Sequence, residues 1–127
     1  MMDRGGGSED RDDSGLLIAL SEARRERLDI PVTFDRRELD QILRVYGFMV
    51  AAGEWRDYAI DFLKDRAVFS VFRRASEVPL YRIEKDPQLA RKQGAYSVIS
   101  ATGHIMRRGP ELDRVLRVLD KSLSVVN

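Results

Sequence analysis

Hydrophobic positions recur along this chain with two different spacings, and the change of spacing divides it into elements. Between Asp35 and Gly53 the apolar residues are three or four positions apart, as in an amphipathic helix. They are Leu39, Ile42, Leu43, Tyr46, Met49 and Val50. Asp35 and Glu38 match a capping box, and Gly53 is placed to end the helix. Gly47 lowers the helix propensity, which suggests close packing at that position.

After Trp55 the apolar spacing changes to two, which is typical of β-strands. The segments with this pattern are DYAIDFL (57–63), AVFSVFRR (67–74), PLYRIEK (79–85) and AYSVISATGHIM (95–106). Gly103 is expected to bend or bulge the last of them. The intervening DPQLARKQG favours a turn or a single helical turn that Gly94 closes.

Helical spacing returns after Gly109, with Pro110 at the expected first helical position. The apolar stripe of this last helix is Leu112, Val115, Leu116, Leu119 and Leu123. The order of elements predicts an α+β fold, in which an antiparallel meander of about four strands is flanked by an N-terminal and a C-terminal helix packed on one face. Leu43 and Leu116 are then expected to face the same side of the sheet.

The domain organisation follows from where these patterns begin. Residues 1–14 are acidic, glycine-rich and without an apolar pattern, so we expect a disordered tail. Residues 15–30 predict a short helix and linker, with Leu17, Leu20, Arg24 and Leu28 along one side. Residues 31–126 are expected to form a single α+β domain. No apolar run is long enough for a signal peptide or a membrane span, and cysteine is absent, which together favour a cytoplasmic protein.

Charge is unevenly distributed although the formal net charge is only +1. Residues 62–109 contain ten basic and four acidic residues, net +6, so an anionic partner is a candidate. The candidate anion-binding or partner-binding residues are Arg73, Arg74, Arg82, Arg91, Lys92, Arg107 and Arg108. Arg107 and Arg108 lead into a helix N-terminus, which attracts phosphates and carboxylates. In residues 67–85, however, strand alternation does not gather the aromatic and basic residues on one face, as a sheet that binds single-stranded nucleic acid would require. We therefore interpret this hairpin mainly as core.

Few residues in the sequence have a pattern that points to chemistry. His104 is the only histidine, and with no cysteine it has no partner for a typical metal site. Glu54, Asp57 and Asp61 are the densest carboxylate group, for which a cation site or acid–base role is the alternative to a solvated strand face. We therefore expect no catalytic residue, no metal and no cofactor.

The segment GEWRDYAIDFLKDRAVFSVFRRAS (53–76), with GAYSVISATGHIMRRG and LDRVLRVLDKSL further on, resembles a family of small alphaproteobacterial proteins. This family is catalogued as domain of unknown function 2794, and the resemblance covers residues 31–126. It implies an intracellular bacterial protein and assigns no catalytic residue.

Three functional hypotheses remain, in order of preference. The first is a non-enzymatic cytoplasmic module that binds an unknown protein partner. The second is a nucleic-acid or phosphorylated-ligand binder that uses the seven basic residues named above. The third is a small-molecule enzyme built on His104 or on Asp57 and Asp61. A contiguous basic face would favour the second hypothesis and scattered arginines the first, while the sequence leaves the oligomeric state open.

Overall fold

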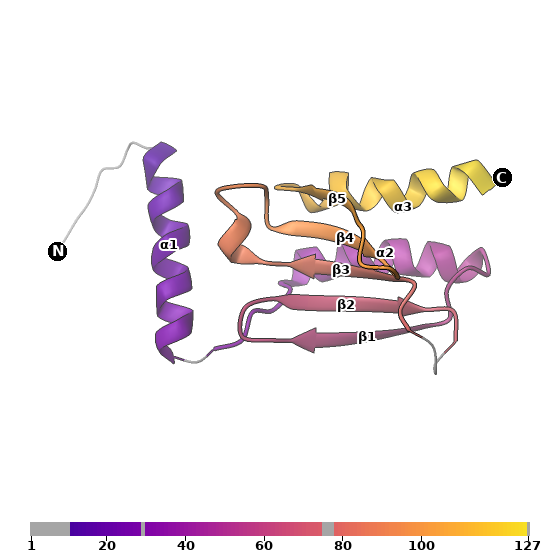
Figure 1. Cartoon of the computed structure of the whole chain (residues 1–127), viewed down its shortest axis with the longest axis horizontal. Helices are drawn as coiled ribbons and strands as arrows, with labels where there is room; N and C mark the ends of the chain where they lie inside the picture. The colour runs from indigo at the N-terminus through magenta and orange to yellow at the C-terminus, as the bar shows by residue number, and fades with distance from the viewer. Residues whose placement is uncertain (1–10, 29, 75–77, 127) are drawn as a thin grey trace.

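The computed structural model describes residues 11–28, 30–74 and 78–126 (Figure 1). In chain order its elements are α1 (Arg11–Leu28), α2 (Arg36–Ala51), β1 (Asp57–Phe62), β2 (Ala67–Phe72), β3 (Tyr81–Lys85), the 3-10 helix η1 (Pro87–Leu89), β4 (Tyr96–Ser100), β5 (Ile105–Gly109) and α3 (Leu112–Val126). The strands form one antiparallel sheet in sequence order, with α2 and α3 on the same face. The predicted α+β fold with both helices on one face is therefore confirmed.

The core lies between the sheet and the two helices, where the period-two pattern of the strands places alternate side chains. Phe69 and Val71 of β2 are fully buried, and Phe69 lies opposite Ile83 of β3. Leu116 is buried, and Leu43 is half-buried against the same cluster. The remaining buried apolar residues of this cluster are Val32, Phe34, Ile42, Met49, Trp55, Ala67, Val98, Leu112, Val115 and Leu119.

Local signals explain the start of α2. The Asp35 carboxylate accepts from the Glu38 backbone N–H at 2.8 Å, and the Glu38 carboxylate accepts from the Asp35 N–H at 2.8 Å. The predicted capping box is therefore present. The expected close packing at Gly47 is wrong, because an added Cβ would have nothing within 4 Å among the described residues outside its own helix backbone.

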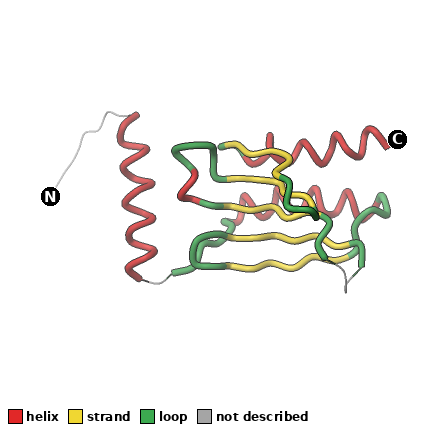
Figure 2. Tube along the Cα trace, viewed as in Figure 1, coloured by secondary structure: helices red, strands yellow, loops and turns green. Residues whose placement is uncertain are grey.

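The meander has one strand more than expected. The segment predicted as a single bent strand is a hairpin, β4 and β5, connected by a tight turn (Figure 2). The Ser100 N–H donates to the His104 carbonyl at 2.8 Å, and Gly103 adopts a φ of +90°. Glycine reaches this left-handed region without a Cβ clash, so what we predicted as a bend reverses the chain.

A second glycine allows two parts of the chain to approach closely. Gly94, after η1, has a φ of +102°, and a Cβ built there would lie 2.1 Å from the Gly109 carbonyl carbon. The same Cβ would lie 2.4 Å from the Pro110 nitrogen. The β3–β4 connection therefore packs directly on the end of β5, and only a residue without a side chain fits.

The N-terminal helix is longer than expected. It begins at Arg11, four residues before the predicted start at residue 15. Residues 1–10 and the side chains of Leu28 and Leu123 lie outside the described part. Helix α1 lies beyond one end of the strands (Figure 1) and contacts η1. Within the described part of the chain, no helix combines the length and apolar character needed to cross a bilayer.

Candidate functional site

The fold places the candidate basic residues at several positions around the sheet. Arg73 and Arg74 follow β2 at one end of the sheet, whereas Arg91 and Lys92 lie in the β3–β4 connection at the opposite end (Figure 1). Arg73 pairs with Glu54 at 3.3 Å.

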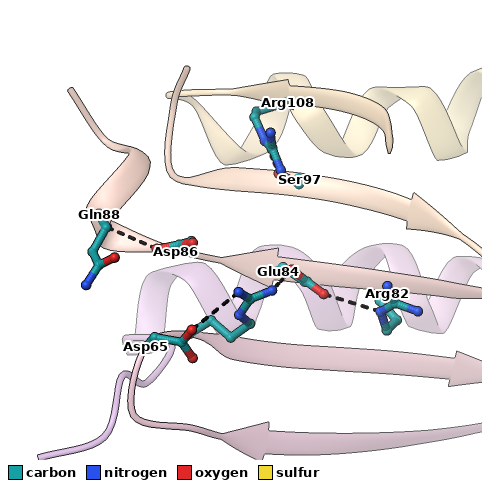
Figure 3. A network of polar contacts seen from close by, with 8 residues as sticks. Asp65, Arg82, Glu84, Asp86, Gln88, Ser97 and Arg108 are labelled. Atoms are coloured by element: carbon teal, nitrogen blue, oxygen red, sulfur yellow. Dashed lines mark hydrogen bonds and ion pairs between the residues drawn. The ribbon is translucent and has the colours of Figure 1, made fainter. Parts of the chain in front are cut away.

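Arg82 belongs to the outer face, which we define as the sheet face opposite α2 and α3. There the Glu84 carboxylate, only 8% exposed, accepts from Arg82 Nε at 3.3 Å and from Arg66 Nη1 at 3.1 Å. Arg66 also pairs with Asp65 at 3.3 Å (Figure 3 shows Asp65, Glu84 and Arg82). This hydrogen bond, with the charges of Glu84, Asp65 and Asp86, raises the pKa of Arg66 although burial opposes the shift. Two arginines are thus matched by two carboxylates.

Arg108 also serves the fold. Its Nε donates to the buried Ser97 hydroxyl at 2.8 Å (Figure 3). Its Nη1 donates to the side-chain amide oxygen of Gln93 at 2.7 Å. Helix α3 begins at Leu112, so Pro110 precedes it by two residues instead of occupying its first position, and Val115 N–H bonds the Glu111 carbonyl. A cavity of about 220 Å³ at this helix start is lined by Arg107, Arg108, Gly109, Pro110, Glu111, Arg114 and Val115. Because Glu111 pairs with Arg114 at 2.7 Å, one carboxylate already lies in this cationic cavity.

The residues considered for catalysis or metal binding do not converge. Asp57 and Asp61 share the outer face of β1 as predicted, but both are exposed and lie opposite the apolar residues Phe72 and Val68. His104 is exposed in the β4–β5 turn, where its backbone N–H donates to Ser100 Oγ at 3.2 Å. Among the described residues, no three His, Cys, Asp or Glu side chains are placed to hold a metal ion.

A buried polar cluster that the sequence did not predict joins α2, β3 and β4. Glu38, 8% exposed, accepts from Lys85 Nζ at 2.8 Å and from the Tyr96 hydroxyl, while Lys85 also donates to the Thr33 carbonyl at 2.9 Å. Burial, then the hydrogen bond and charge of Glu38, raise the pKa of Tyr96. The capping box identified Glu38, but its partners are 47 and 58 residues away, where no local pattern reaches.

This cluster forms the floor of a cavity under α1. The cavity has a volume of about 330 Å³, and its lining includes Leu17 and Ile18 of α1 and Pro87, Ala90 and Ala95 of the β3–β4 connection. Each polar group of the cluster has a partner within it, because Lys85 neutralises Glu38 and Tyr96 donates to it. The arrangement is typical of a structural ion pair that ties a helix to a sheet.

Strand β1 forms one edge of the sheet. Within the described residues β1 pairs with β2 alone, in continuous register from Asp57 to Phe62. Its aromatic residues Tyr58 and Phe62 are 46% and 45% exposed, and the neighbouring Leu63 is exposed as well. The side of β1 away from β2, here called the β1 edge, presents backbone donors and acceptors beside apolar side chains.

Comparison with known proteins identifies a family and no function. A family model described as "Protein of unknown function (DUF2794)" matches residues 32–116. No curated protein matches the chain, and no solved structure does. The matched range contains α2, all five strands of the sheet and the start of α3, whereas α1 lies outside it.

Proposed function

We propose that this chain, which belongs to the DUF2794 family, is a non-enzymatic module that binds another protein along the β1 edge. One observation carries the proposal: six consecutive residues in regular register at the border of the sheet, with exposed aromatic side chains beside them. An exposed strand edge of this kind is a template on which another strand can pair. We propose that the protein acts in the cytoplasm, as the sequence leads us to expect.

The mode of binding we propose is strand addition. In this mode main-chain hydrogen bonds provide much of the affinity, and alternate side chains provide the selectivity. On the helix side Tyr58 and Phe62 would contact apolar residues of the added strand. On the outer face the carboxylates of Asp57 and Asp61 would disfavour acidic residues directly opposite them.

The second candidate is an anionic ligand held by basic residues, and one observation favours it. Three arginines line the cavity at the start of α3, although Glu111 lies among them. The other candidate cations are dispersed over both ends of the sheet, and Arg73 and Arg82 are matched by carboxylates. A small-molecule enzyme based on His104 or on Asp57 and Asp61 ranks third.

Site-specific photocrosslinking in living cells tests the proposed function. Phe62 on β1 is replaced by benzoylphenylalanine, and Ile105 on β5, which is 43% exposed, is replaced in the same way as a matched control. We expect a discrete cross-linked protein from position 62 and none from position 105. Equal cross-linking from both positions, or none from position 62, would contradict binding at the β1 edge.

A further inference from the structure

We propose that the protein bound at the β1 edge is a second copy of this chain, so that two sheets join through antiparallel β1 strands with Ile60 facing Ile60. This inference rests on the proposed function and names its partner. The two copies would be related by a two-fold axis perpendicular to the sheet. Closed two-fold dimers of this type are the commonest form of homo-oligomer.

The first step is to establish which residues of β1 point their backbone groups outward. Across the β1–β2 hairpin the Leu63 N–H donates to the Arg66 carbonyl at 2.8 Å. In an antiparallel ladder, alternate residues direct both backbone groups to the same neighbour, so the odd-numbered residues of β1 bond β2. The N–H and C=O groups of Tyr58, Ile60 and Phe62 therefore face away from β2.

The second step is to find the register in which these three residues pair with their copies. A register centred on Ile60 places Tyr58 opposite Phe62 of the second copy and uses all three outward-facing residues. Centred on Ala59, it would place Asp57 opposite Asp61, and centred on Asp61 it would place two copies of Asp61 face to face. Like charges directly opposite each other destabilise a strand pair. The two carboxylates thus select the Ile60 register, in which Ala59 lies opposite Asp61.

The third step concerns the side chains that this register brings together. Tyr58 stacks on Phe69 with ring centroids 4.9 Å apart, and Phe62 forms a T-shaped pair with Phe34, with ring centroids 6.5 Å apart. Both exposed aromatics are therefore held in position before any partner binds, which lowers the ordering cost of association. In the paired state Tyr58, Ile60 and Phe62 of both copies form one apolar stripe on the helix side. The cores of the two copies become continuous along it.

A cysteine cross-link tests the register directly, because the parent chain has no cysteine. Facing residues of a hydrogen-bonded antiparallel pair have Cα atoms about 5.5 Å apart, within the range of a disulfide. Under mild oxidation we expect the purified Ile60→Cys variant to form a covalent dimer. Tyr58→Cys and Phe62→Cys should each remain uncross-linked alone and cross-link when mixed. Ile105→Cys is the control on β5. A dimer that cross-links through Ile105→Cys and not through Ile60→Cys would overturn the proposal.

Sedimentation analysis of the cysteine-free protein tests the dimer itself. We expect twice the chain mass of 14.6 kDa for the parent. Ile60→Lys should weaken dimerisation by about tenfold or more, because it places two ammonium groups face to face, while Ile105→Lys should leave it unchanged. Circular dichroism checks that both variants are folded. If Ile60→Lys is unfolded, the cross-linking of the cysteine variants tests the dimer instead. A parent that stays monomeric overturns the second copy as partner, whereas a cellular cross-link from position 62 to a different protein would leave the proposed function intact.

Discussion

Strand β5 ends the sheet with five residues, a register shift opposite Val98 and Ile99, and the adjacent cations Arg107 and Arg108, whereas β1 ends it with six residues in continuous register. Pro110 directly follows β5 and lacks a backbone donor. Bulges, charged side chains (lysine especially) and prolines are among the features by which natural sheets prevent edge pairing. Strand β1 has no register shift and no lysine, arginine or proline between Asp57 and Phe62, and its only charged residues are Asp57 and Asp61.

This difference indicates which edge is available to a partner. The carboxylates of Asp57 and Asp61 lie on the outer face, where they would restrict the register of an added strand. Arg108 has a different role, because it bonds Ser97 and Gln93 within its own chain. In the proposed dimer, the carboxylates on β1 therefore select the register of strand pairing. The arginines on β5 lie on an edge whose register is already shifted.

The largest expected effect tests how firmly the β5 edge is held. Gly94→Ala places a methyl group where the Gly109 carbonyl carbon lies 2.1 Å away, in a backbone conformation that alanine rarely adopts. We expect a loss of about 3 kcal/mol or more in the free energy of unfolding, measured with urea. Gly47→Ala is the control and should stabilise α2 by about 0.5–1 kcal/mol. Similar unfolding curves for the two variants would mean that the close contact at β5 is wrong.

The next prediction compares how much α3 and α2 each contribute to the free energy of unfolding. Helix α3 contacts β4 and β5, and Leu116 is 3% exposed. Leu116→Ala should therefore cost about 2–5 kcal/mol of unfolding free energy. Leu43→Ala, at a half-buried position of α2, should cost less. Calorimetry of both variants checks the ranking, and a larger loss for Leu43→Ala would reverse it.

The pH dependence of stability tests the hydrogen bond between Tyr96 of β4 and Glu38. The raised pKa of Tyr96 means that the folded protein holds the phenol proton more tightly than the unfolded chain, whose tyrosines titrate near 10. Stability is therefore fully present below about pH 10 and is lost as the pH rises through the folded pKa. Tyr96→Phe should reduce this decline, to which the raised pKa of Tyr46 also contributes, and cost about 1–2 kcal/mol at pH 7, because Glu38 loses a donor. Tyr58→Phe on β1 is the control, and urea unfolding between pH 7 and 11 is the measurement. An unchanged alkaline decline in Tyr96→Phe would refute the assignment.

The smallest expected effect concerns the cations of β5. Arg107 is exposed, so Arg107→Gln should change the free energy of unfolding by less than about 0.5 kcal/mol. Retention on heparin should be weak in the parent and equal in the variant. Steep salt-dependent binding that Arg107→Gln diminishes would favour the anionic-ligand hypothesis and weaken the contrast between the edges.

Much of the fold was predictable from patterns that act within a few residues. The spacing of Leu39, Ile42 and Tyr46 predicted α2, and Asp35 with Glu38 marked its beginning. Alternation of Phe69 and Val71 with Val68 and Ser70 predicted a strand, and Phe69 and Val71 lie in the core. These signals are reliable because helix and strand periods place side chains on faces independently of distant sequence. The extra turn at Gly103 was partly predictable, since glycine marked the position but not the reversal.

The candidate site depended on contacts between distant residues, which local periods do not encode. Glu38 meets Lys85 and Tyr96 only because α2 packs across β3 and β4, and Gly94 meets Gly109 only because two connections converge. Seven basic residues within 36 positions made an anionic partner a candidate, and antiparallel pairing places these residues at different ends and faces of the sheet. The sequence by itself determined the elements and their buried faces. Tertiary structure decided which charges became paired and which distant backbone segments came into contact, because both depend on contacts between residues far apart in the sequence.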